Sequence, residues 1–259
     1  MSCRLFKFLL LPIILALTTL PASAGSITIA AAADLKFAMD NITATFRKAH
    51  PDDSVKVIYG SSGKFYTQIR QGAPFDLFFS ADIGYPKKLA RAGLTASTPR
   101  AYALGRIVLW SAEVDASKLS LEDLVKPSFD RIAVANPQHA PYGERAVEAL
   151  KSSGVWNQVK GKLVYGENIG QTAQFVRTGN ARIGIIALSL ALNPAFASRG
   201  GYATIPTRLY KPLIQGFVIT RHAADNPLAK TFAKFIDSAS AQAIFKHYGF
   251  ARIPAGTAP

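Results

Sequence analysis

Apolar and polar positions alternate along this chain in two periods, one typical of strands and one typical of helices. Residues 26–30 form an apolar run that predicts a strand, and residues 35–49 carry apolar side chains at helical spacing. The alternation continues, with strands predicted at 55–59, 76–80, 106–111, 131–135, 163–165, 183–187 and 216–220, and helices at 64–71, 143–152, 169–178, 228–237 and 241–247. Strands that alternate with helices predict an α/β fold with mixed, mostly parallel sheets flanked by helices.

The pattern of elements also predicts two lobes. It restarts near Ala103, and the last elements have no sheet of their own. We therefore expect one lobe from residues 25–104 plus 217–259 and a second lobe from residues 105–216. The chain would cross near 103–112 and return near 213–220. Ligands in such folds bind outside the carboxyl ends of the strands, so a cleft between the lobes is the expected site.

The first residues have the features of a secretory signal. Arg4 and Lys7 precede a short apolar run over residues 8–17, and Ala22-Ser23-Ala24 resembles a cleavage site. A transmembrane anchor is the alternative, but it needs about 20 apolar residues. Cleavage near Ala24 removes Cys3, the only cysteine, so the secreted chain has no disulfide or thiol site. We expect a soluble protein that is periplasmic in a cell with two membranes.

The charge is strongly basic, with 30 Lys+Arg against 16 Asp+Glu. Without Arg4 and Lys7 the balance is 28 against 16, a net charge of +12. Such a field attracts small anions. The basic residues are scattered and form no nucleic-acid-binding motif, and export argues against nucleic acid as a partner.

Four strand-to-helix turns carry the candidate chemistry. They lie around Asp34, at residues 61–63, at residues 141–143 and at residues 168–170. Each places small or polar residues where the first N–H groups of a helix lack partners, and such groups bind anions without a charged side chain. Ordinary helix capping by Asp34, Ser61 and Asn168 is the alternative for each turn alone. An oxyanion site requires that the turns converge.

Several stretches resemble the molybdate-binding proteins of ABC importers, in order over nearly the whole mature chain. They are residues 29–35 (IAAAADL), 60–63 (GSSG), 72–82 (GAPFDLFFSAD), 136–143 (NPQHAPYG) and 248–250 (YGF). The resemblance implies the two-lobed periplasmic-binding-protein fold, with a cleft that holds molybdate or tungstate through neutral donors. It also implies the membrane subunits of an ABC importer as partners. A monomer with no cofactor and no enzymatic activity is expected.

The resemblance also assigns the ligand positions. The serine of the second turn corresponds to Ser62, the tyrosine of the third turn to Tyr142, and the backbone donor of the fourth turn to Ile169. These three residues would contact the oxygens around the metal. In one subtype of the family the ligand tyrosine instead follows the strand after the fourth helix, but Ala187 stands there. The chain resembles the subtype with a tyrosine after the proline of the third turn.

Asp34 departs from the family pattern, which has Ser or Thr-Asn as donors at the first turn. An ionised carboxylate is only an acceptor and repels a dianion, by about 4 kcal/mol for one unit pair at 4 Å and an effective dielectric of 20. Three explanations are open: Asp34 caps its own helix, Asp34 is protonated, or the ligand differs. We expect the capping arrangement, because Asp is a preferred N-cap residue.

Three other functions compete with oxyanion binding. A secreted hydrolase would need a nucleophile beside a base, and His139 near Tyr142 is the one suggestive pair, although a position at the rim of the site is expected for it. A ferric-ion binder on the same fold would recruit Tyr142, His139 and Asp34. The sensory domain of a larger receptor is the third, and another oxyanion is a further alternative ligand.

Overall fold

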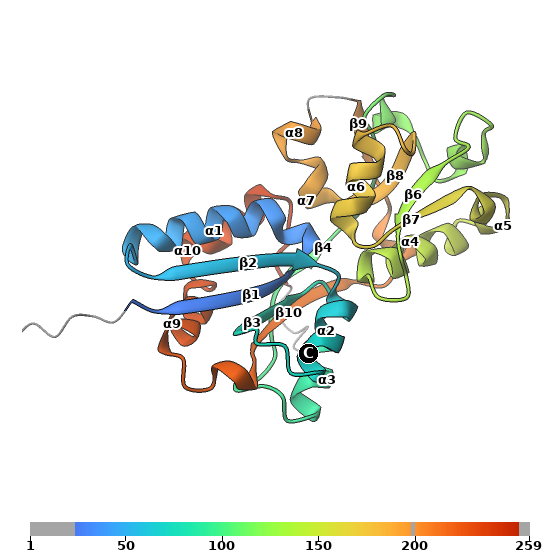
Figure 1. Cartoon of the computed structure of the whole chain (residues 1–259). Helices are drawn as coiled ribbons and strands as arrows, with labels where there is room; N and C mark the ends of the chain where they lie inside the picture. Colours follow the sequence, from blue (N-terminus) through green and yellow to red (C-terminus); the bar gives the residue numbers. More distant parts are fainter. Residues whose placement is uncertain (1–23, 198–199, 254–259) are drawn as a thin grey trace, which may run out of the picture.

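The structure is a computed structural model that describes residues 24–197 and 200–253. The predicted signal peptide therefore lies almost entirely outside the described residues. Figure 1 shows two lobes joined by extended segments, each built around its own sheet. Within the described ranges, no helix has the length and apolar character needed to cross a membrane.

The first lobe holds a five-stranded sheet and five helices. Its strands are β1 (Ser26–Ala32), β2 (Ser54–Gly60), β3 (Leu77–Ser80), β4 (Arg100–Gly105) and β10 (Leu213–Ile219). Its helices are α1 (Lys36–Ala49), α2 (Ser62–Arg70), α3 (Gly84–Arg91), α9 (Pro227–Phe235) and α10 (Ala239–His247). A 3-10 turn (Ala33–Leu35) joins β1 to α1, and another (Arg221–Ala223) follows β10.

The second lobe also holds five strands and five helices. Its strands are β5 (Ile107–Ser111), β6 (Ile132–Ala135), β7 (Leu163–Gly166), β8 (Ile183–Ala187) and β9 (Gly201–Thr204). Its helices are α4 (Pro141–Ser152), α5 (Trp156–Val159), α6 (Ile169–Arg177), α7 (Leu188–Ala191) and α8 (Pro194–Ala197). Short 3-10 turns lie at Ala116–Lys118, Glu122–Val125, Lys160–Lys162 and Thr207–Leu209.

The two sheets have the same plan. Their strand orders are β2-β1-β3-β10-β4 and β7-β6-β8-β5-β9. In each sheet the fourth strand in space pairs antiparallel with both neighbours, while the other strands share one direction. The reversed strands, β5 and β10, are the ones that enter from the other lobe. This confirms the α/β class with mixed, mostly parallel sheets.

The chain crosses between the lobes twice within a few residues. The first crossing lies between the end of β4 at Gly105 and the start of β5 at Ile107, and the second lies just before β10 at Leu213. Because Leu213 pairs with Gly105, the two crossings lie side by side. Strand β10 pairs in the first sheet from Leu213 onward. The exact division into lobes at 104/105 and 216/217 stays a prediction.

Each lobe buries its own apolar core. In the first lobe the ring of Phe79 stacks on that of Phe217 at 4.8 Å between centroids, and Phe232 meets Phe79 edge-on. In the second lobe Trp110 is buried, and its ring meets that of Phe196 edge-on at 5.3 Å between centroids. Strand β3 is buried on both faces, which explains its continuous apolar sequence.

The helix starts differ from those expected in a way that affects the site. Helix α2 begins at Ser62 rather than at residue 64, and α4 begins at Pro141 rather than at 143. Ser62 and Tyr142 are therefore the first and second helical residues instead of turn residues. Helix α3, the short helices α5, α7 and α8, and strands β4 and β9 were not expected from the sequence; α5, α7, α8 and β9 have only four residues each.

Candidate functional site

The four predicted turns converge on one small cavity where the lobes meet. The cavity has a volume of about 10 Å³, which is room for about one water molecule. Its walls are formed by Ala32, Ala33, Asp34, Gly60, Ser61, Ser62, Ala81, Ala140, Pro141, Tyr142 and Ile169. All four predicted ligand residues, Asp34, Ser62, Tyr142 and Ile169, are in this list.

Helix N-termini from both lobes point at this cavity. Ser62 is the first residue of α2, Ile169 is the first residue of α6, and Pro141 is the first residue of α4. The N–H groups of first-turn residues have no acceptor inside their own helix, and the helix dipoles make this region positive. The described wall contains no lysine or arginine, so the positive potential comes from backbone groups. Such an arrangement can hold an anion by neutral donors.

Ser62 is fully buried, and its hydroxyl oxygen is already an acceptor. The backbone N–H of Ala81 donates to Ser62 Oγ at 3.0 Å. This bond leaves the hydroxyl hydrogen of Ser62 to donate to a bound group, since a hydroxyl both accepts and donates. The backbone of Ala81 in the first lobe therefore orients the Ser62 hydroxyl, which presents a donor at the cavity wall.

Asp34 lies at the centre of a buried network that spans both lobes. Its Oδ2 accepts from the hydroxyl of Tyr142 at 3.0 Å and from Nε2 of Gln215 at 2.6 Å. Gln215 Nε2 also reaches the Tyr142 hydroxyl at 3.1 Å, while Gln215 Oε1 accepts from Tyr102 at 2.5 Å. Asp34 Oδ1 is buried and has no hydrogen-bond partner among the described residues.

The hydroxyl of Tyr142 therefore donates to Asp34 in this structure and not into the cavity. Gly105 at the first crossing makes this approach possible. A Cβ at position 105 would lie 2.4 Å from the Tyr142 hydroxyl oxygen and 2.8 Å from Gln215 Nε2. Burial, together with the Asp34 charge, raises the pKa of Tyr142 well above its ordinary value, so the phenol keeps its proton as a donor.

The expectation that Asp34 caps its own helix is wrong. Its side chain makes no capping hydrogen bond, and it belongs to the 3-10 turn before α1. Tyr142 of the second lobe and Gln215 of β10 bind the carboxyl group instead. Asn168 does cap α6, by accepting from Gly170 and Gln171. Burial raises the pKa of Asp34 from 3.8 to about 6, although the bonds from Gln215 and Tyr142 oppose this shift.

Sequence reasoning missed Gln215. It is fully buried on β10, at a register shift beside Gly216, and pairs with residues of three other elements. The only local signal is a single amide side chain in an otherwise apolar strand, LIQGFVI. A buried polar group needs partners, and that requirement alone marks it as a candidate.

Further contacts join the lobes around the cavity. Ser189 of α7 donates to the backbone carbonyl of Asp34 at 2.8 Å, and Arg145 of α4 lies 3.5 Å from Asp82. His139 approaches the start of α2, with its Nδ1 3.1 Å from Ser61 Oγ. The lobes are thus closed on one another, and His139 lies at the rim of the cavity.

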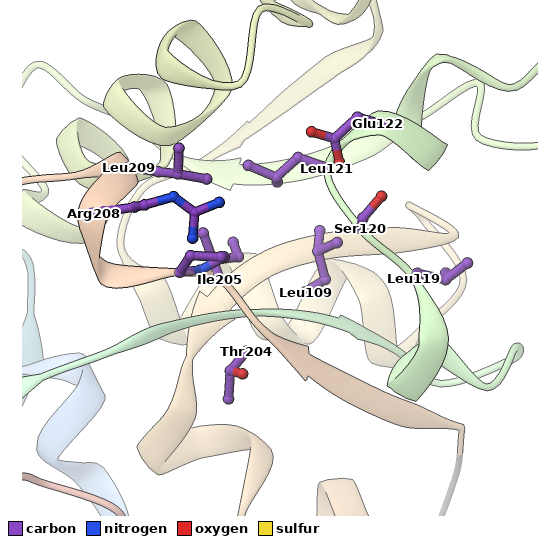
Figure 2. Close-up of a pocket in the computed structure, with 10 residues that line it drawn as sticks. Leu109, Leu119, Ser120, Leu121, Glu122, Thr204, Ile205, Arg208 and Leu209 are labelled. Carbon is purple, nitrogen blue, oxygen red and sulfur yellow. The ribbon is translucent and has the colours of Figure 1, made fainter.

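Other cavities lie apart from this network or beside it. A second cavity, with a volume of about 290 Å³, lies within the second lobe. Figure 2 shows Ile205 and Arg208 on one side of it and residues 119–122 on the other. It involves one lobe only and has no residue in common with the site between the lobes. Within the described ranges, no three His, Cys, Asp or Glu side chains gather as a metal site. Among the described contacts, the ring of His139 pairs with Ser61 and Glu167, while Tyr142 pairs with Asp34.

The two-lobed fold and the small cavity between its lobes define a solute-binding protein. The chain belongs to the bacterial extracellular solute-binding proteins, whose family model matches residues 27–251, and within them to the ModA molybdate-binding proteins. It is 38% identical to the molybdate-binding protein ModA of Azotobacter vinelandii, over 88% of this chain and 91% of that protein. It is 37% identical to ModA of Rhodobacter capsulatus, over 89% and 90% respectively.

Solved structures agree with this assignment. The periplasmic molybdate-binding protein of Azotobacter vinelandii superposes with a TM-score of 0.83 at 29% identity, covering 88% of this chain and all of that one. The sulfate-binding protein SubI of Mycobacterium tuberculosis has a TM-score of 0.72 at 15% identity, which supports the fold alone.

The raised pKa of Asp34 predicts how stability depends on pH in the ligand-free protein. The folded state holds a proton on Asp34 up to about pH 6, whereas the unfolded chain releases it near 3.8. The contribution of Asp34 to stability therefore falls as pH rises from about 4 to about 6, by roughly 3 kcal/mol. Urea unfolding of wild type and Asp34→Asn across this range measures the difference. The wild type should lose stability relative to the variant as pH rises, and parallel curves would show that Asp34 titrates normally.

Proposed function

We propose that this protein captures molybdate or tungstate outside the cytoplasm and delivers it to the membrane subunits of an ABC importer. One observation carries the proposal: helix N-termini from two lobes converge on a small cavity whose donors are neutral. The relatives named as molybdate-binding proteins support the choice of ligand. The oxyanion is the cargo, and no separate cofactor takes part.

Donors from three of the turns are proposed to hold the oxyanion. Ser62 offers its hydroxyl and backbone N–H, Ile169 its backbone N–H, and the turn at Ala33 and Asp34 further backbone donors. Hydrogen bonds to charged groups are worth roughly 1.5–3 kcal/mol each. The contact of Tyr142 is indirect in this proposal, because its hydroxyl donates to Asp34.

Asp34 is proposed to bind the oxyanion in its neutral form. A proton on Oδ1, the oxygen without a partner among the described residues, makes the carboxyl group a donor to the ligand. Oδ2 meanwhile keeps its bonds from Tyr142 and Gln215. A dianion in the cavity favours this proton further, because it repels an ionised carboxylate. The family's neutral donor at this turn would thus be replaced by a protonated acid.

A cleaved signal peptide over residues 1–24 would place the mature protein in the periplasm, as a monomer that meets the importer through its two lobes. The net charge of +12 after cleavage steers small anions toward it. Nucleic acid is not part of the proposal.

A hydrolase is the one enzymatic alternative with a structural counterpart. Ser61 Oγ and His139 Nδ1 are 3.1 Å apart, and His139 Nε2 lies 3.7 Å from Glu167 Oε2. This resembles a nucleophile, a base and an orienting acid. The adjoining cavity holds one small group, however, and Ser61 is buried against the opposite lobe. The relatives named as molybdate-binding proteins favour a binding protein over an enzyme.

Calorimetric titration tests the proposed ligand. Molybdate and tungstate should bind tightly, and sulfate and phosphate should bind at least thirtyfold more weakly. A rigid cage fitted to the larger ions leaves donors unpaired around a smaller one, at about 1–3 kcal/mol each. Equal affinity for sulfate, or preference for ferric citrate, would contradict the proposal.

Ser62→Ala tests the cavity as the binding site. The loss of a hydroxyl donor to a charged acceptor should weaken molybdate binding by roughly one to two powers of ten. The free protein should also lose about 1–3 kcal/mol of stability, because the Ala81 N–H loses its acceptor. Ser153→Ala is the matched control, since the Ser153 hydroxyl bonds to the carbonyl of Leu150 in the second lobe. Unchanged affinity in Ser62→Ala would place the ligand elsewhere.

A further inference from the structure

Helix α2 receives its N-terminal cap from the opposite lobe. The backbone N–H of Gly63, in the first turn of α2, donates to the carbonyl oxygen of His139 at 2.9 Å. Ser61 occupies the N-cap position, but its side chain makes no capping bond to its own helix. The Ser61 hydroxyl pairs instead with Nδ1 of His139 at 3.1 Å. In an ordinary N-cap, the serine hydroxyl accepts from a first-turn N–H of its own helix. Here His139 of the second lobe pairs with both the Ser61 hydroxyl and the Gly63 N–H.

The packing at this contact leaves no spare room. A Cβ at Gly63 would lie 2.8 Å from the His139 carbonyl oxygen and 2.9 Å from His139 Cα. Both partners there are backbone atoms, which cannot rotate away. The absence of a side chain at position 63 is therefore what lets the second lobe come this close to α2.

A charged contact lies beside this cap. Lys64, the next residue of α2, pairs with Glu167 of the second lobe, and Glu167 Oε2 lies 3.7 Å from His139 Nε2. Ser61, Gly63 and Lys64 thus meet His139 and Glu167 at the rim of the oxyanion cavity. Ser62, the proposed ligand, lies between these contacting residues and is fully buried.

We propose that His139 is a positioning residue that latches the closed lobes by exchanging the cap of α2. When the lobes separate, the Ser61 hydroxyl and the first-turn N–H groups of α2 are free to pair as an ordinary N-cap. Closure replaces that local cap with bonds to His139 and holds the Ser62 turn against the ligand. Because capping groups are satisfied in both states, the exchange is reversible and neither state carries an unpaired buried donor.

The latch acts on dissociation of the ligand more than on its capture. Its bonds form only after the second lobe has reached α2, so they are absent when an oxyanion first enters the open cleft. A contact present only in the closed state shifts the equilibrium toward that state by its own free energy. Loss of the latch should therefore speed release and leave association nearly unchanged. This inference rests on the proposed oxyanion-binding function.

Gly63→Ala separates the latch from the stability of the helix. Alanine is a better helix former than glycine, and the structure shows no positive φ at Gly63, so helix α2 itself should be at least as stable in the variant. The added methyl group meets the His139 backbone and should hold the lobes apart. We expect molybdate to dissociate at least tenfold faster by stopped-flow displacement, with association changed less than twofold. Scattering should also show a smaller decrease in radius of gyration on binding.

Gly161→Ala and His222→Ala are the controls, and His139→Ala is a second test of the latch. Gly161→Ala is the same substitution at a glycine whose Cβ would meet nothing within 4 Å, and it should behave as wild type. His139→Ala keeps the carbonyl bond to Gly63 but removes the ring bond to Ser61, so its dissociation rate should lie between wild type and Gly63→Ala. His222→Ala, at an exposed histidine, controls for the loss of a ring.

The outcomes separate the latch from the proposed function. A wild type that binds neither molybdate nor tungstate overturns the proposed function and the latch with it. A wild type that binds and contracts, together with Gly63→Ala and His139→Ala variants that release molybdate at the wild-type rate, overturns the latch alone. Slower association in Gly63→Ala with unchanged dissociation would also contradict the latch.

Discussion

The arrangement of this protein depends on a carboxyl group buried between two lobes. Asp34 is almost fully buried, and a buried carboxylate is costly unless it is hydrogen-bonded or takes up a proton. Here Tyr142 comes from the second lobe and Gln215 from the strand that returns to the first, and both donate to the same oxygen. The closed state of the lobes and the protonation of Asp34 are therefore linked, because the bond from Tyr142 crosses between the lobes and exists only when they meet.

The fold explains how these distant residues reach one another. The reversed strand β10 enters the first sheet beside the crossing at Gly105, and this places Gln215 next to the tyrosine that α4 presents from the other lobe. Glycine at position 105 leaves space for the Tyr142 hydroxyl. The ends of β1, α2, α4 and α6 then surround the remaining space, so the crossing and the binding cavity are parts of one structure.

The sequence predicts local features well and long-range ones poorly. Periodicity located most of the strands and long helices, and the turn residues identified four helix starts that do converge. The cap at Asn168 depends on its own helix, so the sequence shows it. Asp34 looks like the same kind of cap, but its partners lie 108 and 181 residues away in the chain. The partner of Ser61 is 78 residues away, and no local pattern reveals such pairs.

The central claim is that neutral Asp34 faces the oxyanion, and proton uptake on binding tests it most directly. Binding enthalpies of molybdate near neutral pH, measured in two buffers that differ in ionisation enthalpy, give the number of protons taken up. Because the pKa of Asp34 is about 6 in the closed structure without a ligand and rises beside a dianion, wild type should take up close to one proton per molybdate, and Asp34→Asn should take up none. Equal enthalpies in both buffers for wild type would show that Asp34 stays ionised in the complex and would contradict the account.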